Sequence, residues 1–382
     1  MKILIDAQPL LGKKTGIGNY TENLIKEFNN LTYETQLITN QTVNFKRLNE
    51  IQLTDKQLYL KNKIYPYKVI RRLSPSKFFY SLPIDLFSKK NERDNLVFHG
   101  TNFISLPTRY AKQVITIHDL AFMKFPNVVE QNIYDYMMRW VPYSIKHADQ
   151  LIAVSENTKR DILEFFDYPE DKIHVVYSAA NERYKKQLDD TIEQVKLKYS
   201  LPNKYFLYLG TLEPKKNLPI IIEALAKLKN EFGSQQKLVV VGAKGWKFNP
   251  IFELVTELGL ENDVIFTGYI ADEDLPAIYS GATAFTFPSF YEGFGIPLLE
   301  AMQCEIPVIA SNASCIPEVV GDGGILLDPN DVDGWTKAMH DISTDTPLHE
   351  EFVRKGLNQA SKFSWEKTAQ LTIEVYKKAL QG

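Results

Sequence analysis

Short β-rich apolar runs alternate with helical patterns along almost the whole chain of 382 residues. Because parallel strands need a crossover connection, usually a helix, this alternation favours parallel sheets built from βαβ units. The expected strands are Lys2–Asp6, Gln113–Ile117 and Gln150–Val154, then Tyr205–Leu209, Lys237–Val241, Val264–Phe266, Ala284–Phe287 and Val308–Ala310. The expected helices cover about 19–29, 218–232, 274–280 and 364–380, and the last is amphipathic.

A chain of this length is long for one hydrophobic core, so two domains are expected. The segment from about 178 to 202 is polar and lacks strand character, which places the junction there. We therefore predict a first domain at 1–185, a second at 186–362 and a final helix at 363–382.

The composition excludes several classes of protein. A hydrophobic content of 44% and a charged content of 24% are typical of globular proteins, and the net charge of −3 argues against a nucleic-acid partner. Cys304 and Cys315 are too few for a disulfide scaffold and lack metal-site spacing, so a reducing cytoplasm is expected. The N-terminus has no signal-peptide pattern, and no apolar run approaches transmembrane length.

The segment 288–302 places two carboxylates, Glu292 and Glu300, eight residues apart, with Gly293 and Gly295 between them. The apolar run before it predicts a strand, and a helical pattern follows from Pro297, which suits the first helical position. The glycines let a phosphate approach the backbone, and a helix N-terminus attracts anions.

We expect Glu300 in the first turn of that helix, where its carboxylate accepts hydrogen bonds from a ribose diol. Glu292 is expected beside the group attached beyond the phosphate. The alternative is an ordinary strand, loop and helix in which Glu292 is solvated and Glu300 supports the helix dipole.

Gly210–Leu218 follows the expected first strand of the second domain and carries the adjacent Lys215 and Lys216. Cations at a helix start are unfavourable against the helix dipole, so an anion partner would explain them. A diphosphate fits this pattern, whereas the alternative is a solvated lysine pair.

Two sites are expected in the first domain, each next to a predicted strand end. Gly16 and Gly18 open the first helix, where the alternative is a simple tight turn. His118 directly follows the strand that ends at Ile117, and ligands of open parallel sheets bind at the carboxyl ends of strands. A structural histidine is the alternative for His118.

These motifs closely resemble the signature of retaining glycosyltransferases of family 4, which have the GT-B fold. The resemblance continues through 307–312, 316–321 and 327–329. Gly210–Leu218 is similar to the family's G-T-x-E-P-R-K-N element, in which Lys216 matches the lysine and Lys215 stands where many members carry arginine. The chain departs from the family at Glu305-Ile306, where a Gly-Thr pair is usual.

The resemblance implies two Rossmann-like domains that face each other across a cleft, with the final helix crossing back to the first domain. It implies transfer of a sugar, with retained anomeric configuration, from a nucleotide-diphosphate donor to a hydroxyl acceptor. Glu300 would contact the ribose, Lys215 and Lys216 the diphosphate, and Glu292 and His118 the transferred sugar. Further donor contacts are expected from Gly16, Gly18, Thr211, Gly293, Phe294, Gly295 and Ile296.

Similarity to mannosyltransferase-like members favours GDP-mannose as donor and a saccharide or lipid-linked saccharide as acceptor, in surface-glycan synthesis. The family implies no cofactor and no obligatory metal. Two other classes stay open, namely another GT-B enzyme such as a phosphorylase or epimerase, and a non-catalytic sugar-nucleotide binding module.

The segment 61–80 carries six basic residues, five aromatic residues and no acidic residue. Such a segment predicts peripheral association with an anionic membrane, which would suit a lipid-linked acceptor. The alternative is an ordinary solvated face.

Overall fold

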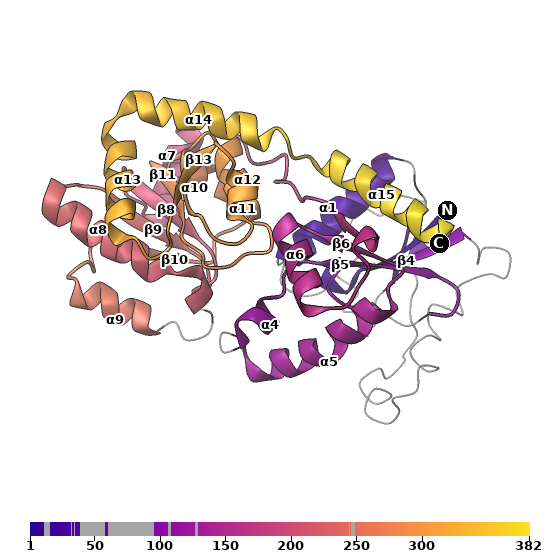
Figure 1. Ribbon diagram of the computed structural model, residues 1–382. Coiled ribbons are helices and arrows are strands. Elements are labelled where there is room, and N and C mark those ends of the chain that lie inside the picture. Colours follow the sequence, from indigo (N-terminus) through magenta and orange to yellow (C-terminus); the bar gives the residue numbers. More distant parts are fainter. Residues whose placement is uncertain are drawn as a thin grey trace. The chain divides into compact units, whose positions relative to one another are not determined.

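The computed structural model describes residues 1–10, 16–31, 33, 35–38, 58–59, 95–105, 108–126, 129–243, 245 and 249–382. The chain divides into two compact units, each with its own sheet and covering helices (Figure 1). The first unit comprises Met1–Lys124, Gln131–Ser178 and Trp365–Gly382, and the second comprises Phe125–Glu130 and Ala179–Ser364. Residues 179–185, which the sequence analysis places in the first domain, group with the second unit, where the Tyr184 ring packs edge-on against Tyr279.

The described part of the first unit has a parallel sheet in the order β3-β2-β1-β4-β5-β6-β7. Its strands are β1 (Lys2–Asp6), β2 (Thr35–Ile38), β3 (Leu58–Tyr59), β4 (Leu96–Gly100), β5 (Lys112–Ile117), β6 (Gln150–Ala153) and β7 (Ile173–Val175). Its helices are α1 (Gly16–Asn30), α4 (Ala121–Lys124), α5 (Gln131–His147), α6 (Glu156–Phe165) and α15 (Trp365–Gln381), with the 3-10 turns η1 (Gln8–Leu10) and η4 (Glu170–Lys172). The central strands are buried along their length, as expected of a parallel sheet covered on both faces.

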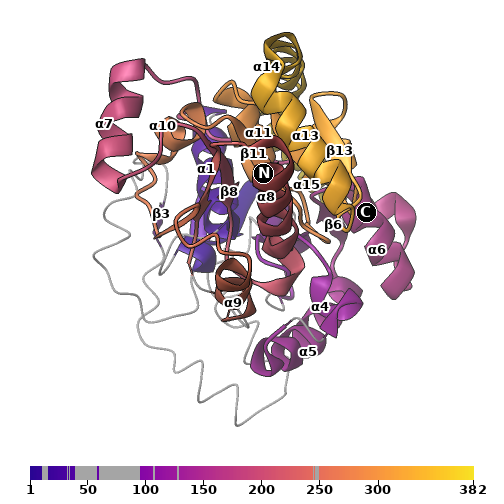
Figure 2. The ribbon, with the colours of Figure 1, turned by 90° about the vertical axis from the view of Figure 1, so that its left-hand side faces the viewer.

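The second unit has a parallel sheet in the order β10-β9-β8-β11-β12-β13. Its strands are β8 (Tyr205–Leu209), β9 (Lys237–Val241), β10 (Val264–Gly268), β11 (Ala284–Phe287), β12 (Val308–Ser311) and β13 (Gly324–Leu327). The helices are α7 (Asp189–Tyr199), η5 (Pro214–Lys216), α8 (Leu218–Phe232), α9 (Asn249–Glu257), α10 (Leu275–Ser280), α11 (Ile296–Gln303), α12 (Ile316–Val320), α13 (Val332–Thr344) and α14 (Thr346–Ala360). Figure 2 shows α7 beside α10, and the two helices are in contact.

Both sheets follow the strand order of doubly wound nucleotide-binding folds, and each has a switch point where the order reverses. In the first unit the switch point lies between β1 and β4, and in the second it lies between β8 and β11. Ligands of such sheets bind beyond the carboxyl ends of the strands at this point. The predicted donor motifs at 210–218 and 288–302 follow β8 and β11, the two strands of the second switch point.

The predicted strands and helices are present, with ends that differ by up to three residues. The expected junction segment contains α7. Most residues of this helix are polar, and only Ile192 and Val195 are buried. No helix of the described residues is long and apolar enough to cross a membrane.

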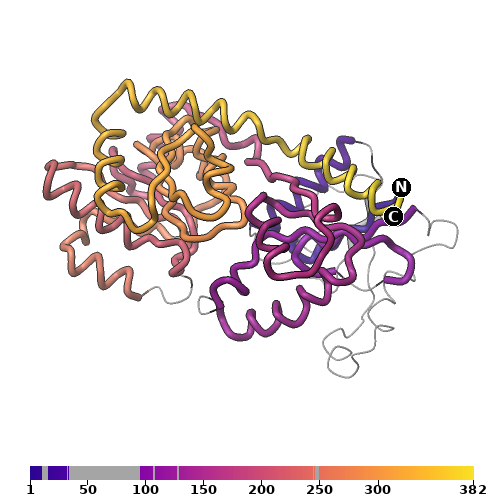
Figure 3. Tube along the Cα trace, viewed as in Figure 1, coloured from indigo at the N-terminus to yellow at the C-terminus, as the bar shows by residue number. Residues whose placement is uncertain are grey.

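The prediction that the final helix returns to the first domain is confirmed, because α15 belongs to the first unit and contacts α1, β4, β5 and β6 (Figure 3). A buried chain of hydrogen bonds fixes it. The Tyr376 hydroxyl lies 2.6 Å from His99 Nδ1, and His99 Nε2 lies 2.8 Å from Thr116 Oγ1. The Thr116 hydroxyl in turn lies 3.1 Å from that of Tyr20. Burial lowers the pKa of His99 to about 3, so this ring is neutral.

We predict that Tyr376→Phe lowers the free energy of unfolding by about 1–3 kcal/mol, because it leaves the buried Nδ1 of His99 without its partner. Urea denaturation measures the loss. Tyr269→Phe is the control, since Tyr269 is 77% exposed and should change stability little. Equal stability of Tyr376→Phe and the unaltered chain would show that this hydrogen bond contributes nothing net.

Candidate active site

The loop between β11 and α11 carries the first predicted carboxylate. Gly295 ends the loop with φ 94, and a Cβ there would lie 2.8 Å from Leu298 Cδ1, so the position requires glycine. Because this left-handed residue caps the helix, α11 begins at Ile296 and Pro297 is its second residue. The prediction that Glu300 lies in the first turn was therefore wrong, since Glu300 is the fifth helical residue and falls in the second turn.

Glu292 forms an ion pair with Lys216, whose Nζ lies 2.5 Å from Oε1. The Glu292 residue is only 8% exposed. Burial alone would raise the pKa of Glu292, but the charges of Lys216 and Lys215 and the hydrogen bond from Lys216 hold it below its usual value. The carboxylate therefore stays ionised at neutral pH, and the two predicted motifs meet at this pair.

The loop after β8 is joined to the loop after β11 by two further sets of hydrogen bonds. Asn217 adopts a left-handed conformation with φ 51, and its Nδ2 donates to the carbonyls of Pro329 at 2.6 Å and Pro288 at 3.3 Å. The backbone N–H of Phe290 donates to the Lys215 carbonyl at 2.9 Å. These bonds fix where the lysines stand relative to Glu292.

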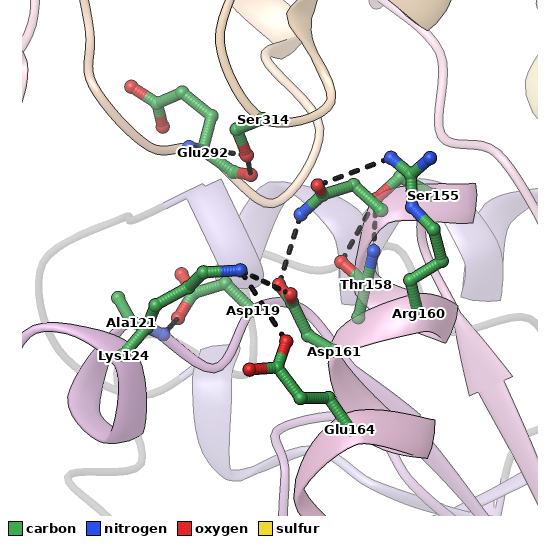
Figure 4. Close-up of polar contacts among 11 residues, drawn as sticks. Asp119, Ala121, Lys124, Ser155, Thr158, Arg160, Asp161, Glu164, Glu292 and Ser314 are labelled. Carbon is green, nitrogen blue, oxygen red and sulfur yellow. Dashed lines mark hydrogen bonds and ion pairs between the residues drawn. The ribbon is translucent and has the colours of Figure 1, made fainter.

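Two serines, one at the end of β12 and one in the loop after it, hold the same segment through further hydrogen bonds. Ser314 Oγ donates to the Glu292 carbonyl at 2.6 Å and accepts from the Glu292 N–H at 3.2 Å (Figure 4). Ser311 Oγ donates to the Ser289 carbonyl at 2.6 Å. Three residues that hold the site were not among the predicted ones, because their role depends on which loops meet in space: Asn217, Ser311 and Ser314.

The remaining predicted donor residues of this unit lie around the pair. Thr211 is exposed beyond the end of β8. Gly293 is buried in the loop, and the Phe294 ring packs edge-on against Phe363 at 5.8 Å. Phe294 therefore anchors the loop with its side chain.

Glu300 differs from Glu292 in having no cation in contact among the described residues. Its Oε2 accepts a hydrogen bond from the Tyr279 hydroxyl at 3.0 Å, and the residue is 8% exposed. Burial raises the pKa of Glu300 to about 7, although hydrogen bonds from Tyr279 and Tyr184 and the charge of Arg183 oppose the rise. A carboxylate kept in such surroundings is more typical of a functional site than of a structural one.

In the first unit, His118 directly follows β5, and its Nε2 lies 2.8 Å from the Thr101 carbonyl. Because a carbonyl only accepts, Nε2 carries the proton. Burial lowers the pKa of His118, so the ring is neutral and Nδ1 offers a lone pair. The ring is held edge-on by Tyr20 at 5.0 Å and Phe103 at 5.4 Å.

The backbone around His118 is fixed by α6 and by the short helix α4. Thr158 Oγ1 donates to the His118 carbonyl at 3.3 Å, and Ser155 caps α6 by accepting from the Thr158 N–H. Asp119 accepts from the Ala121 N–H at 3.0 Å, and Lys124 pairs with the buried Asp161 at 2.8 Å. Figure 4 shows the contact of Ser155 with Thr158, that of Asp119 with Ala121 and that of Lys124 with Asp161.

Gly16 and Gly18 lie in the first turn of α1, as the prediction of a helix start implied. Among the described residues, no atom outside its two chain neighbours and the helix's own backbone lies within 4 Å of the place that a Cβ on Gly16 would take. Gly18 is buried. No group of three or more potential metal ligands occurs among the described residues. The segment 61–80 lies outside the described part of the chain, so its membrane role stays a prediction.

Two family models match the chain in succession. Residues 14–183 match the model described as Glycosyltransferase Family 4, and residues 189–359 match that described as Glycosyl transferases group 1. The chain is 32% identical to O-antigen chain mannosyltransferase B of Escherichia coli, over 99% of this chain and 100% of that protein. It is 29% identical to the serotype-specific mannosyltransferase WbdA of Escherichia coli, over 100% of this chain and 48% of that protein.

Among solved structures, HepE of Anabaena in complex with UDP and glucose superposes with a TM-score of 0.75 at 21% identity, over 98% of each chain. WaaG, a glycosyltransferase involved in lipopolysaccharide biosynthesis, superposes with a TM-score of 0.73 at 13% identity, over 98% of this chain and 99% of that chain. These likenesses confirm the predicted GT-B class of fold, with two parallel-sheet α/β domains.

The fold and the two family models thus define a glycosyltransferase of the GT-B class. The chain belongs to the family 4 glycosyltransferases, in the mannosyltransferase-like group.

The raised pKa of Glu300 predicts a pH-dependent loss of stability. The folded chain holds this proton more tightly than the unfolded chain, so stability falls as pH rises from 4.5, the ordinary value, to about 7. Glu300→Gln has no carboxyl group to titrate, so it removes this effect. The change that Glu300→Gln makes in the free energy of unfolding should therefore be more stabilising at pH 8 than at pH 4, by up to about 3 kcal/mol. Urea denaturation at both pH values measures it, with the exposed Glu257→Gln as control. A Glu300→Gln effect that is the same at both pH values would contradict this.

Proposed function

We propose that the chain is a retaining hexosyltransferase that moves a sugar from a nucleotide-diphosphate donor to a saccharide or lipid-linked saccharide in surface-glycan synthesis. The observation that carries the proposal is the partly buried Lys216–Glu292 pair at the second switch point, with Glu300 on the adjoining helix. The names of the O-antigen mannosyltransferase relatives support the glycan class.

The diphosphate would lie between the lysines and the start of α11. Lys215 and Lys216 offer ammonium donors, and the loop from Gly293 to Gly295 leads into the start of α11, where the helix dipole attracts anions. Charge that grows on the departing diphosphate is stabilised by such fixed donors, which need no rearrangement during the reaction.

The transferred sugar would be held by hydrogen-bond acceptors. Glu292 is ionised, so both of its oxygens accept, and its bond to Lys216 places it beside the diphosphate site. The neutral His118 accepts at Nδ1 because Nε2 is committed to Thr101. Both residues therefore suit sugar hydroxyls, and neither is arranged as a proton donor. The leaving phosphate would assist deprotonation of the acceptor on the same face, as the family resemblance implies.

GDP-mannose is the donor we favour, supported by the mannosyltransferase relatives, whereas HepE was solved with UDP and glucose. The test is turnover with GDP-mannose, GDP-glucose, UDP-glucose and dTDP-glucose and a mannose-terminated saccharide acceptor. We expect a mannosylated product with retained configuration, identified by NMR. Binding without turnover of any donor would favour the non-catalytic module. Formation of a sugar phosphate from the saccharide and added inorganic phosphate, without a nucleotide donor, would favour a phosphorylase.

Lys216→Ala should lower kcat by at least about tenfold, because the proposed interaction strengthens as charge builds on the leaving group and bonds to charged groups are worth about 1.5–3 kcal/mol. Lys229→Ala is a matched control, since Lys229 is also a partly buried lysine, paired with Asp263 at 3.0 Å. Equal activities of the two variants would reduce Lys216 to a structural role.

The proposal needs no metal, and we predict that activity survives EDTA. The diphosphate charge is offset by Lys215, Lys216 and the helix start instead of a divalent ion. The comparison is between initial rates with and without EDTA at about 5 mM, which is a large excess over trace metal. Loss of activity that manganese or magnesium restores would reveal a metal site.

A cytoplasmic location and membrane association through 61–80 also stay predictions.

A further inference from the structure

Glu300 is held from α10, a short helix whose side chains and backbone are tied on several sides. The Tyr279 hydroxyl donates to Glu300 Oε2 at 3.0 Å, and Tyr279 is fully buried. The Tyr279 ring packs edge-on against Tyr184 at 5.8 Å and against Phe285 of β11 at 5.4 Å. The phenol therefore has little freedom to turn away from the carboxylate.

The helix that carries Tyr279 is itself anchored by neighbouring segments. The Tyr205 hydroxyl of β8 donates to the Ile278 carbonyl at 2.7 Å. From the segment before α7, Lys186 Nζ donates to the Ser280 carbonyl at 3.2 Å, and the Gln187 N–H donates to Ser280 Oγ at 3.1 Å. These bonds flank Tyr279 on both sides, so its position is fixed before any ligand binds.

We propose that Tyr279 is the positioning residue for Glu300, holding one carboxylate oxygen so that the ionised group is presented to two adjacent hydroxyls of a ribose. This inference rests on the proposed function, which assigns Glu300 to the nucleotide. A carboxylate has about four acceptor sites, and Tyr279 occupies one of them at Oε2. Enough acceptor sites remain for both the 2′- and the 3′-hydroxyl.

The other groups around Glu300 are less suited than the Tyr279 hydroxyl to hold its carboxylate. The titratable or charged groups that act on Glu300 are Tyr279, Tyr184, Arg183 and Asp272, and the Cys304 thiol lies on its own helix. Arg183 is engaged with Asp272 at 3.9 Å, and Asp272 opposes ionisation of Glu300. Hydrogen-bond donation by the phenol, together with a weaker contribution from Tyr184, therefore favours the charged form that a diol needs.

The first experiment needs no ligand. NMR titration of the Glu300 carboxyl carbon, assigned with Glu300→Gln, compares the unaltered chain with Tyr279→Phe. Loss of the phenol should raise the pKa of Glu300 by about one unit, and Tyr184→Phe should raise it less. Tyr168→Phe is the matched control, because it removes a tyrosine hydroxyl bond to a backbone carbonyl, that of Ala148 in the first unit, and leaves α10 and Glu300 unchanged. An unchanged Glu300 titration in Tyr279→Phe overturns the inference.

The second experiment measures recognition of the ribose, by calorimetry with GDP and UDP and their 2′-deoxy counterparts at pH 7. The unaltered chain and Tyr168→Phe should prefer each ribonucleotide by about tenfold, as expected for a site built to bind the hydroxyl. Tyr279→Phe should lose most of this preference and bind the ribonucleotide about fivefold more weakly, since the ionised fraction of Glu300 falls from about a half to about a tenth.

The two experiments separate two kinds of failure. If Glu300→Gln binds both ribonucleotides as tightly as the unaltered chain, the assignment of Glu300 to the ribose is wrong, whatever the titration shows. If Glu300→Gln weakens binding but Tyr279→Phe keeps the full ribose preference, the nucleotide site stands and Tyr279 has no positioning role.

Discussion

The ion pair between the partly buried Lys216 and the buried Glu292 is the interaction on which the second unit's site depends. It joins the loops that follow β8 and β11, the two strands where the sheet order reverses. Breaking such a pair leaves an uncompensated charge in a buried place, which costs far more than an exposed pair would. The bonds from Asn217 and Ser314 hold the two loops in the geometry that the pair requires.

The two carboxylates of the site have pKa values that are shifted in opposite directions. Glu292 has ammonium groups beside it, and its pKa is lowered, whereas Glu300 has phenol hydroxyls, and its pKa is raised to about 7. A carboxylate next to an ammonium suits a place near a diphosphate, where cations are already required. A carboxylate without a cation in contact keeps its acceptor sites for neutral hydroxyls. The difference in surroundings thus matches the two proposed tasks.

Much of the fold was predictable because its signals are local. The glycine turns, the apolar strands and the lysine pair can each be recognised within about ten residues. Glu305 shows the limit of such matching. It stands where the resembled family usually carries glycine, and its φ of 60 shows why glycine is usual there. The helix before it, α11, still ends at Gln303.

The sequence by itself determined the parallel α/β class, the order of the motifs and the candidates Lys216, Glu292, Glu300 and His118. Only the tertiary structure decided that Lys216 reaches Glu292, that Tyr279 holds Glu300 and that Thr101 fixes the protonated nitrogen of His118. The physical reason is separation along the chain. These contacts join residues that are 76, 21 and 17 positions apart, and no local pattern records which strands become neighbours in a sheet.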